Sequence, residues 1–329
     1  MIIMNMQRCK NDRQRRSILR CKVVKTVAML VSVLFVMSGC AKENGKIKQT
    51  ETTTVQDITT KVNQTETTVL TGIVTERVEV IVDVSELVIE AGDKKIYGKL
   101  YSPNNADNLK TVVFCHDNNG SLEDWERECN YFAKNGFAAY AFDFCGGSRE
   151  DRSSGAITEM TITSEKEDLN AVFSFLSGMD VVDKDNIYLC GRGSGGLVCA
   201  LWAKEAASKV KAMALYYPAF SMPDEFREKY KAADEIPEVT DYYGTQLSRE
   251  YVKEAMDLDV FNLIGNYKED VLIIHGDEDE IVPYSYSEIA EKTYEHCELM
   301  KMLNEGHVFS LKAGVNAYEK VFAFFNEEK

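Results

Sequence analysis

The sequence lacks a long hydrophobic segment, and it contains fewer basic than acidic residues. Its longest apolar run is the eleven residues from Val27 to Met37, interrupted only by Ser32, and a comfortable membrane-spanning helix needs more. Lys and Arg number 38 against 53 Asp and Glu, which gives a net charge of -15. Such a surface repels phosphate groups, so we expect no nucleic-acid partner.

The sequence also lacks the Cys and His patterns of metal sites. None of its nine Cys stands in a CxxC pair or beside a His at zinc-like spacing. The acidic residues 277–280 carry no calcium-ligand spacing. We therefore expect no metal and no cofactor. Cys115, Cys190 and Cys199 fall in expected strands or helices, where a free thiol packs as a small apolar group, and the spacing requires no disulfide.

The first forty residues have the layout of an export signal. Residues 1–25 carry eight basic residues and one acid, Asp12, and the short apolar run is followed by Ser38-Gly39-Cys40. This end resembles the lipobox of bacterial lipoproteins, although Met37 stands where Leu is usual. The resemblance implies that Cys40 is lipidated after removal of residues 1–39. The alternative is an uncleaved N-terminal anchor, and both place the domain outside the cytoplasm at a membrane.

The next segment reads as a tether. Residues 40–74 are rich in Thr, Glu, Lys and Gln and poor in large apolar residues, so they bury too little surface to offset the entropy of ordering. Without residues 1–39, 30 basic and 52 acidic residues remain, a net charge of -22. We expect the folded domain over residues 75–329.

Strands and helices alternate through that domain, which predicts an α/β fold with a mostly parallel sheet covered by helices on both faces. Residues 78–101, broken at Ala91-Gly92-Asp93, suggest antiparallel strands at its start. Residues 218–267 interrupt the alternation and are expected to form a small cap. Its aromatic side chains either line an acyl or aryl pocket or pack the cap itself: Tyr242, Tyr243, Tyr251 and Phe261. Expected strands are 111–115, 137–144, 187–190, 212–217, 271–275 and 298–303, and expected helices are 122–135, 163–178, 197–203, 284–296 and 313–327.

The run Gly191-Arg192-Gly193-Ser194-Gly195-Gly196 joins an apolar strand to a helix. Four glycines in a strand-to-helix turn are typical of a nucleophile elbow, Gly-x-Ser-x-Gly, which lifts one side chain above the sheet. In register with that motif, the nucleophile position is Gly193, which has no side chain. Ser194 is the alternative nucleophile, but it would put Arg192 where the turn needs a small residue.

Residues 95–325 resemble the α/β-hydrolase superfamily, closest to bacterial cinnamoyl or feruloyl esterases and lipase-like serine hydrolases. Besides the elbow, the motifs that carry the likeness are Phe114-Cys115-His116, Asn135-Gly136-Phe137, Phe142-Asp143-Phe144, the run from Ile273 to Asp279 with Val282-Pro283, and Glu305-Gly306-His307.

The resemblance implies roles for several polar residues. His307 matches the general base and Asp279 the acid that orients it, while His116 and His275 match structural positions. The oxyanion would be held by backbone N-H groups of Asn118 and Ser194. The family has Gly where this sequence has Asp117, and a carboxylate there weakens anion stabilisation unless it points away or is protonated.

Two departures, Gly193 and Asp117, fall in one pocket. The family implies a carboxylic ester hydrolase acting on a small acyl or aryl ester, and the departures imply that serine-based activity is impaired. Ser194 would have to replace the missing hydroxyl for ordinary catalysis. The alternative is a membrane-tethered, non-catalytic pseudo-hydrolase that binds a ligand or partner. A third hypothesis is an envelope interaction protein that uses its acidic surface and cap.

Overall fold

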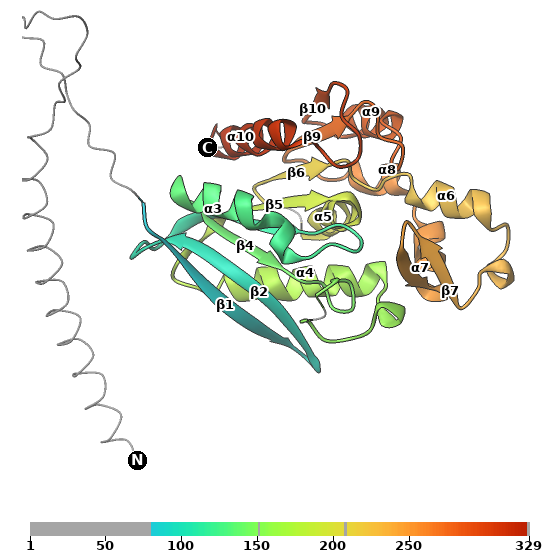
Figure 1. Cartoon of the computed structure of the whole chain (residues 1–329), viewed down its shortest axis with the longest axis horizontal. Helices are drawn as coiled ribbons and strands as arrows, with labels where there is room; N and C mark the ends of the chain where they lie inside the picture. Colours follow the sequence, from blue (N-terminus) through green and yellow to red (C-terminus); the bar gives the residue numbers. More distant parts are fainter. Residues whose placement is uncertain (1–79, 151, 207–208, 328–329) are drawn as a thin grey trace, which may run out of the picture. The chain divides into compact units, whose positions relative to one another are not determined.

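The computed structural model describes residues 80–150, 152–206 and 209–327, which belong to the unit Glu76–Lys329. They form an eight-stranded sheet in the order β1-β2-β4-β3-β5-β6-β9-β10 (Figure 1). The strands are β1 (Val82–Ala91), β2 (Lys94–Pro103), β3 (Leu109–Cys115), β4 (Ala138–Phe142), β5 (Val182–Arg192), β6 (Ala212–Tyr216), β9 (Asp270–Gly276) and β10 (Cys297–Met302).

Six of these strands, from β4 to β10, pair in parallel, and β1 and β2 extend the sheet antiparallel. Every residue of β4 and β6 is buried, as expected for parallel strands covered on both faces. The predicted α/β-hydrolase fold, with a mostly parallel central sheet between helices, is confirmed.

Helices cover both faces of the sheet. One face packs with α3 and α10 around Phe132, Tyr188 and Phe325. The other face packs with α4, α5 and α9 around residues such as Leu169 and Val198. These helices are α3 (Glu126–Lys134), α4 (Ile162–Leu176), α5 (Gly193–Ala206), α9 (Ser285–Thr293) and α10 (Leu311–Glu327).

The segment 218–267 adds a group of short elements, seen in Figure 1 at the opposite end of the unit from β1. They are α6 (Met222–Lys229), β7 (Val239–Tyr242), β8 (Thr245–Ser248), α7 (Arg249–Asp257) and α8 (Val260–Ile264). Tyr251 is fully buried there, and its hydroxyl donates to Glu165 Oε2 of α4 at 3.1 Å. The ring of Phe261 packs near Phe220 and Tyr286. These two aromatic side chains therefore pack the insertion.

Element boundaries differ from the predictions at the turns. The expected helix 122–135 begins as a 3-10 turn, η2 (Leu122–Trp125), before α3. The helix after the elbow begins at Gly193, because β5 passes into α5 without a loop. The hairpin β7–β8 was not expected; Tyr243 and Gly244 form its turn with φ of 49° and 86°, a two-residue turn that matches the twist of the strands.

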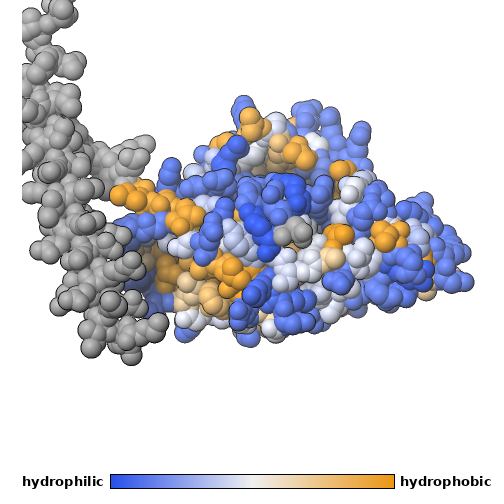
Figure 2. Space-filling view, turned by 60° about the horizontal axis from the view of Figure 1, so that its bottom comes forward, coloured by the Kyte–Doolittle hydropathy of each residue, from blue (hydrophilic) through white to orange (hydrophobic). Residues whose placement is uncertain are grey.

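The face of the unit seen in Figure 2 is mostly hydrophilic, with separate small hydrophobic patches. Among the residues that the structure describes, no helix combines the length and apolar character needed to cross a bilayer. The expected signal, Cys40 and the tether lie outside the described residues.

Candidate active site

The elbow joins β5 to α5 at the carboxyl end of the sheet. Gly193 has φ of 47°, in the left-handed region that favours glycine. A Cβ on Gly195 would lie 2.3 Å from the carbonyl oxygen of His116, so the elbow and the loop after β3 touch backbone to backbone. The glycine-rich turn thus sets the position of the Ser194 N-H beside that loop.

The carboxylate of Asp117 occupies the centre of the site. Its Oδ1 accepts hydrogen bonds from the backbone N-H groups of Asn118 at 2.7 Å and Ser194 at 2.8 Å. The Ser194 hydroxyl donates to the same oxygen at 3.3 Å. Oδ2 lies 3.1 Å from Nε2 of His307. The two N-H groups expected to hold an oxyanion are therefore brought together, and a side chain of the protein itself fills their site.

Asp117 also occupies the space that a side chain at position 193 would need. A Cβ built on Gly193 would lie 2.0 Å from Oδ1, 2.2 Å from Cγ and 2.3 Å from Oδ2 of Asp117. These separations are far below van der Waals contact. The missing elbow side chain and the carboxylate are therefore complementary: neither a serine nor an alanine fits at residue 193 while Asp117 stands where it does.

His307 lies between two carboxylates. Nδ1 donates to Oδ2 of Asp279 at 2.9 Å, and Nε2 donates to Asp117. Asp279 is fully buried and its Oδ1 accepts from the N-H groups of Ile281 and Val282 at 2.8 and 2.9 Å. His275, fully buried, adds a third contact to Asp279 at 3.1 Å from its Nε2. The chain therefore holds Asp279 rigidly behind the imidazole.

This arrangement favours a protonated imidazole. Burial lowers the pKa of His307, but hydrogen bonds to Asp117 and Asp279 outweigh it and raise the pKa to about 9. Burial raises the pKa of Asp117, and the contact with His307 and the two N-H groups more than reverse this, so its pKa lies below the usual value. The pKa of Asp279 is lowered in the same way by His275 and His307. At neutral pH the site is therefore a cation between two carboxylates.

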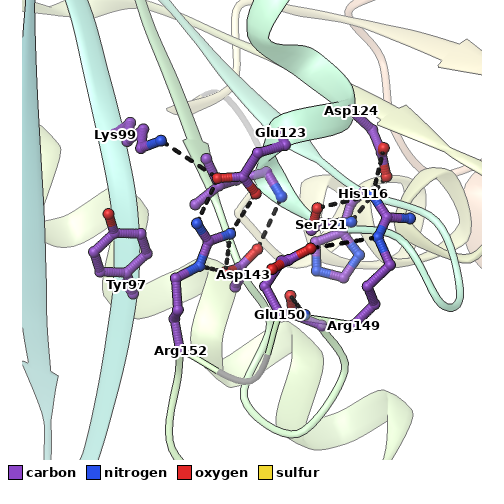
Figure 3. A network of polar contacts seen from close by, with 12 residues as sticks. Tyr97, Lys99, His116, Ser121, Glu123, Asp124, Asp143, Arg149, Glu150 and Arg152 are labelled. Atoms are coloured by element: carbon purple, nitrogen blue, oxygen red, sulfur yellow. Dashed lines mark hydrogen bonds and ion pairs between the residues drawn. The ribbon is translucent and has the colours of Figure 1, made fainter.

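The loop that carries Asp117 is held by a network of ion pairs (Figure 3). Nδ1 of His116 donates to the carbonyl oxygen of Asp117 at 2.8 Å, while its Nε2 accepts from the N-H of Phe144 at 3.1 Å. Further along, Arg152 bonds both Glu123 and the buried Asp143, the latter at 2.8 Å. These contacts fix the backbone on either side of residues 117–121 to β4 and the loop after it.

Arg149 closes the same network from the loop after β4. Its guanidinium donates to the carbonyl oxygen of Asn119 at 3.1 Å and to Asp124 at 2.8 Å. The backbone N-H of Arg149 donates to the carbonyl oxygen of Gly120 at 3.0 Å. The position of Asp117 is therefore supported by residues that the sequence motifs did not single out.

A cavity of about 530 Å³ opens beside the His307 loop. Tyr217, whose ring centre is 4.3 Å from that of His307, lines it with Val308, Phe309 and Arg192. Asp117 and His307 do not line this cavity. Among the described residues, no three His, Cys, Asp or Glu side chains are arranged to hold a metal ion.

The model of the prolyl oligopeptidase family matches residues 124–328. The chain belongs to this family. The match includes the elbow, Asp279 and His307 and begins after Asp117. It places this prolyl oligopeptidase family member among hydrolases of serine type, within the α/β-hydrolase superfamily. Among curated proteins, none matches the chain.

Several solved structures similar to this family member are esterases. Est1E from Butyrivibrio proteoclasticus, bound to ferulic acid, is 26% identical with a TM-score of 0.66, covering 74% of this chain and 98% of that one. The esterase EaEST from Exiguobacterium antarcticum is 18% identical with a TM-score of 0.56, covering 74% and 100%. Acetyl xylan esterase from Paenibacillus sp. R4 is 18% identical with a TM-score of 0.56, covering 74% and 84%. The expected likeness to esterases is confirmed.

The sequence singled out the residues that meet here, but not how Asp117 lies. Asp279, His307, Asn118 and Ser194 all lie around the elbow, as the motif order implies. The Ser194 hydroxyl donates to Oδ1 of Asp117, and Nε2 of His307 contacts Oδ2 of the same carboxylate. Asp117 points into the oxyanion site and not away from it. The only signal for this in the sequence is that Asp117 and Gly193 depart from the family pattern together.

Proposed function

We propose that this protein is an extracytoplasmic α/β-hydrolase in which serine-based ester hydrolysis is lost. The observation that supports this is the carboxylate of Asp117, which fills the oxyanion site and contacts His307 where an attacking hydroxyl would lie. A substrate carbonyl oxygen has no free pair of N-H donors at this point, and those donors are what stabilise the tetrahedral intermediate of acyl transfer.

Ser194 is a poor substitute for the missing nucleophile. It is buried, and its hydroxyl donates to Oδ1 of Asp117, the oxygen on the far side of the carboxylate from His307. A serine attacks esters only when a base takes its proton, and His307 is paired with Asp117 and Asp279, which raise its pKa to about 9. Ester turnover by Ser194 would first require Asp117 to leave the site.

The test is to rebuild the family site. Gly193→Ser alone clashes with Asp117, so the informative variant is the double change Asp117→Gly with Gly193→Ser. We expect wild type and both single variants to be inactive on a panel of short-chain and cinnamoyl-type esters. The double variant should gain at least about 10²- to 10³-fold, because it restores the nucleophile and frees both oxyanion donors, and a single donor is worth that much. A fluorophosphonate probe should label the double variant at position 193 and leave wild type unlabelled.

Ester hydrolysis by wild type at the rate of the double variant, with fluorophosphonate attached to Ser194, would contradict this proposal. An inactive double variant that remains folded by circular dichroism would mean that the pocket has changed beyond these two positions.

A second candidate function is binding without catalysis. It is favoured by the pairing of every reacting group within the chain: Asp117, Asp279 and His307 satisfy one another. Such a protein would hold a small acyl or aryl compound or a protein partner in the inherited site. Equilibrium binding of ferulic acid, compared between wild type and a variant of the cavity residue Tyr217→Ala, measures this directly.

We also propose that Cys40 is lipidated and tethers the domain to the outer side of a bacterial membrane. The motif Ser38-Gly39-Cys40 after a short apolar run supports this. Metabolic labelling with a palmitate analogue should mark wild type and the matched Cys21→Ser variant but not Cys40→Ser. Equal labelling of all three chains would rule out lipidation at Cys40.

A further inference from the structure

We propose that Asp117 is itself the nucleophile of a different hydrolysis, in which its carboxylate opens an epoxide through a covalent ester. The inference rests on the proposed loss of serine chemistry and goes beyond it. Carboxylates serve as covalent nucleophiles in several classes of enzyme, so the side-chain chemistry is adequate. What assigns the role here is the set of groups around each oxygen of Asp117.

Because Asp117 occupies the oxyanion site, the N-H donors there can stabilise negative charge only on its Oδ1 atom. Oδ1 of Asp117 already accepts the N-H groups of Asn118 and Ser194. These donors therefore stabilise a transition state only if negative charge develops on Oδ1 itself. That happens when water attacks Cγ of an Asp117 ester, because Oδ1 is then the carbonyl oxygen of that ester. The site is arranged for hydrolysis of an ester formed on Asp117, not of one brought by the substrate.

The other oxygen is the one that can attack. Oδ2 contacts His307 and accepts no described backbone donor. The Asp117 side chain is 27% exposed and that of His307 is 13% exposed, so a small molecule can reach this edge of the carboxylate from solvent. An attack from Oδ2 leaves Oδ1 in place between its two N-H donors.

His307 decides the substrate class. Its two ring nitrogens lie 2.9 Å from Asp279 and 3.1 Å from Oδ2 of Asp117, and a position between two carboxylates favours the protonated imidazole, so Nε2 can supply a proton to an oxygen that departs from the attacked carbon. An epoxide has such an oxygen, and ring strain makes its carbon a good electrophile. A carboxylic ester does not suit the site, because its carbonyl oxygen would need the N-H donors that Oδ1 occupies.

The first step forms the ester. Oδ2 of Asp117 attacks one ring carbon, the bond from that carbon to the ring oxygen breaks, and the ring oxygen takes the proton from Nε2 of His307. The imidazole is now neutral and Asp117 carries a hydroxyalkyl group. With the negative charge of Asp117 gone, the imidazole is also freed from its ion pair.

The second step hydrolyses the ester. Neutral His307 takes a proton from water, the oxygen of that water bonds to Cγ of Asp117, and the charge on Oδ1 is held by Asn118 and Ser194. The bond from Cγ to the alkoxy oxygen then breaks, and that oxygen takes the proton of the new carboxyl group. A diol leaves, and the Asp117 carboxylate and protonated His307 are restored. The net reaction adds one water to the epoxide.

The source of the diol oxygen tests the mechanism. The purified full chain, in excess over styrene oxide, is allowed one turnover in water enriched in heavy oxygen. We expect the heavy atom in Asp117, detected by mass spectrometry of its peptide, and ordinary oxygen in the first diol. His307→Gln removes the proton donor of the first step and the base of the second, so it should form neither diol nor adduct. Asp117→Asn should form neither diol nor adduct, while the exposed control Asp107→Asn should behave as wild type.

Heavy oxygen in the diol with none in the protein would overturn a covalent role for Asp117. So would the absence of both diol and adduct with wild type, as expected for a non-catalytic binding site. Either result leaves the loss of serine chemistry standing, because the ester panel and the fluorophosphonate probe test that separately.

Discussion

The carboxylate of Asp117 lies 2.0 to 2.3 Å from the point where a side chain on Gly193 would begin. Asp117 lies in the loop after β3 and Gly193 is the first residue of α5. Glycine leaves room for the carboxylate, and the carboxylate fills the space left by the missing side chain. We therefore expect changes at these two positions to be strongly coupled.

A double-mutant cycle measures this coupling. Gly193→Ala alone should lower the free energy of unfolding by about 3 kcal/mol, from steric overlap with Asp117 and a positive φ. In an Asp117→Gly background the same change should cost only about 1 kcal/mol, the backbone part. Urea denaturation of the four proteins gives the interaction energy. Equal costs in both backgrounds would show that the loop moves freely away from residue 193.

The titration of His307 should depend on Asp117. The pKa of His307 is raised to about 9 from an ordinary 6.5, so its ion pairs stabilise the fold fully below pH 6.5, and this contribution is lost as the pH rises through 9. A pKa difference of one between the folded and unfolded states corresponds to about 1.4 kcal/mol of stability. Asp117→Asn should bring the pKa down and move the loss of stability to lower pH. NMR titration of the imidazole measures it, and an unchanged pKa in Asp117→Asn would contradict the ion pair.

Glu165 should oppose folding at high pH. Burial raises its pKa to about 8, although the bond from Tyr251 acts in the other direction. An acid that is neutral when folded and ionised when unfolded lowers stability as the pH rises from its unfolded value near 4.3 to 8. Glu165→Gln should therefore stabilise the protein by on the order of 3 kcal/mol at pH 8 and little at pH 4. Urea denaturation of wild type and Glu165→Gln at pH 4 and pH 8 measures the two differences in the free energy of unfolding.

The network around the Asp117 loop should depend more on Arg152 than on Arg149. Arg152 pairs with Asp143, whose side chain is fully buried, whereas Arg149 and its partner Asp124 are 42% and 37% exposed. Arg152→Gln leaves a buried carboxylate without its cation and should cost about 3 kcal/mol. The matched change Arg149→Gln should cost under about 1 kcal/mol. Thermal unfolding of both variants distinguishes them, and comparable losses would mean that Asp143 is not the critical partner.

Much of the fold follows from local patterns. Continuous apolar strands such as residues 111–115 and 271–275 predict a parallel sheet, since only a sheet covered on both faces buries such runs. The glycine-rich turn after β5 predicts the elbow, and chain order places Asp279 and His307 near it. The hairpin of the insertion was missed because its four-residue strands are too short for a clear period.

The sequence by itself indicated the parallel α/β sheet and the absence of a side chain at Gly193, and its resemblance to the α/β-hydrolase superfamily implied Asp279 and His307 as acid and base. These inferences follow from residue identity, local periodicity and the order of motifs along the chain. Only the tertiary structure decided that Asp117 fills the gap at Gly193 and pairs with His307. Asp117 is 77 residues from Ser194 and 190 residues from His307 along the chain, and the fold brings all three into contact. The position of Asp117 depends on how Arg149 and Arg152 hold the loop after β3, and no local sequence pattern encodes that position.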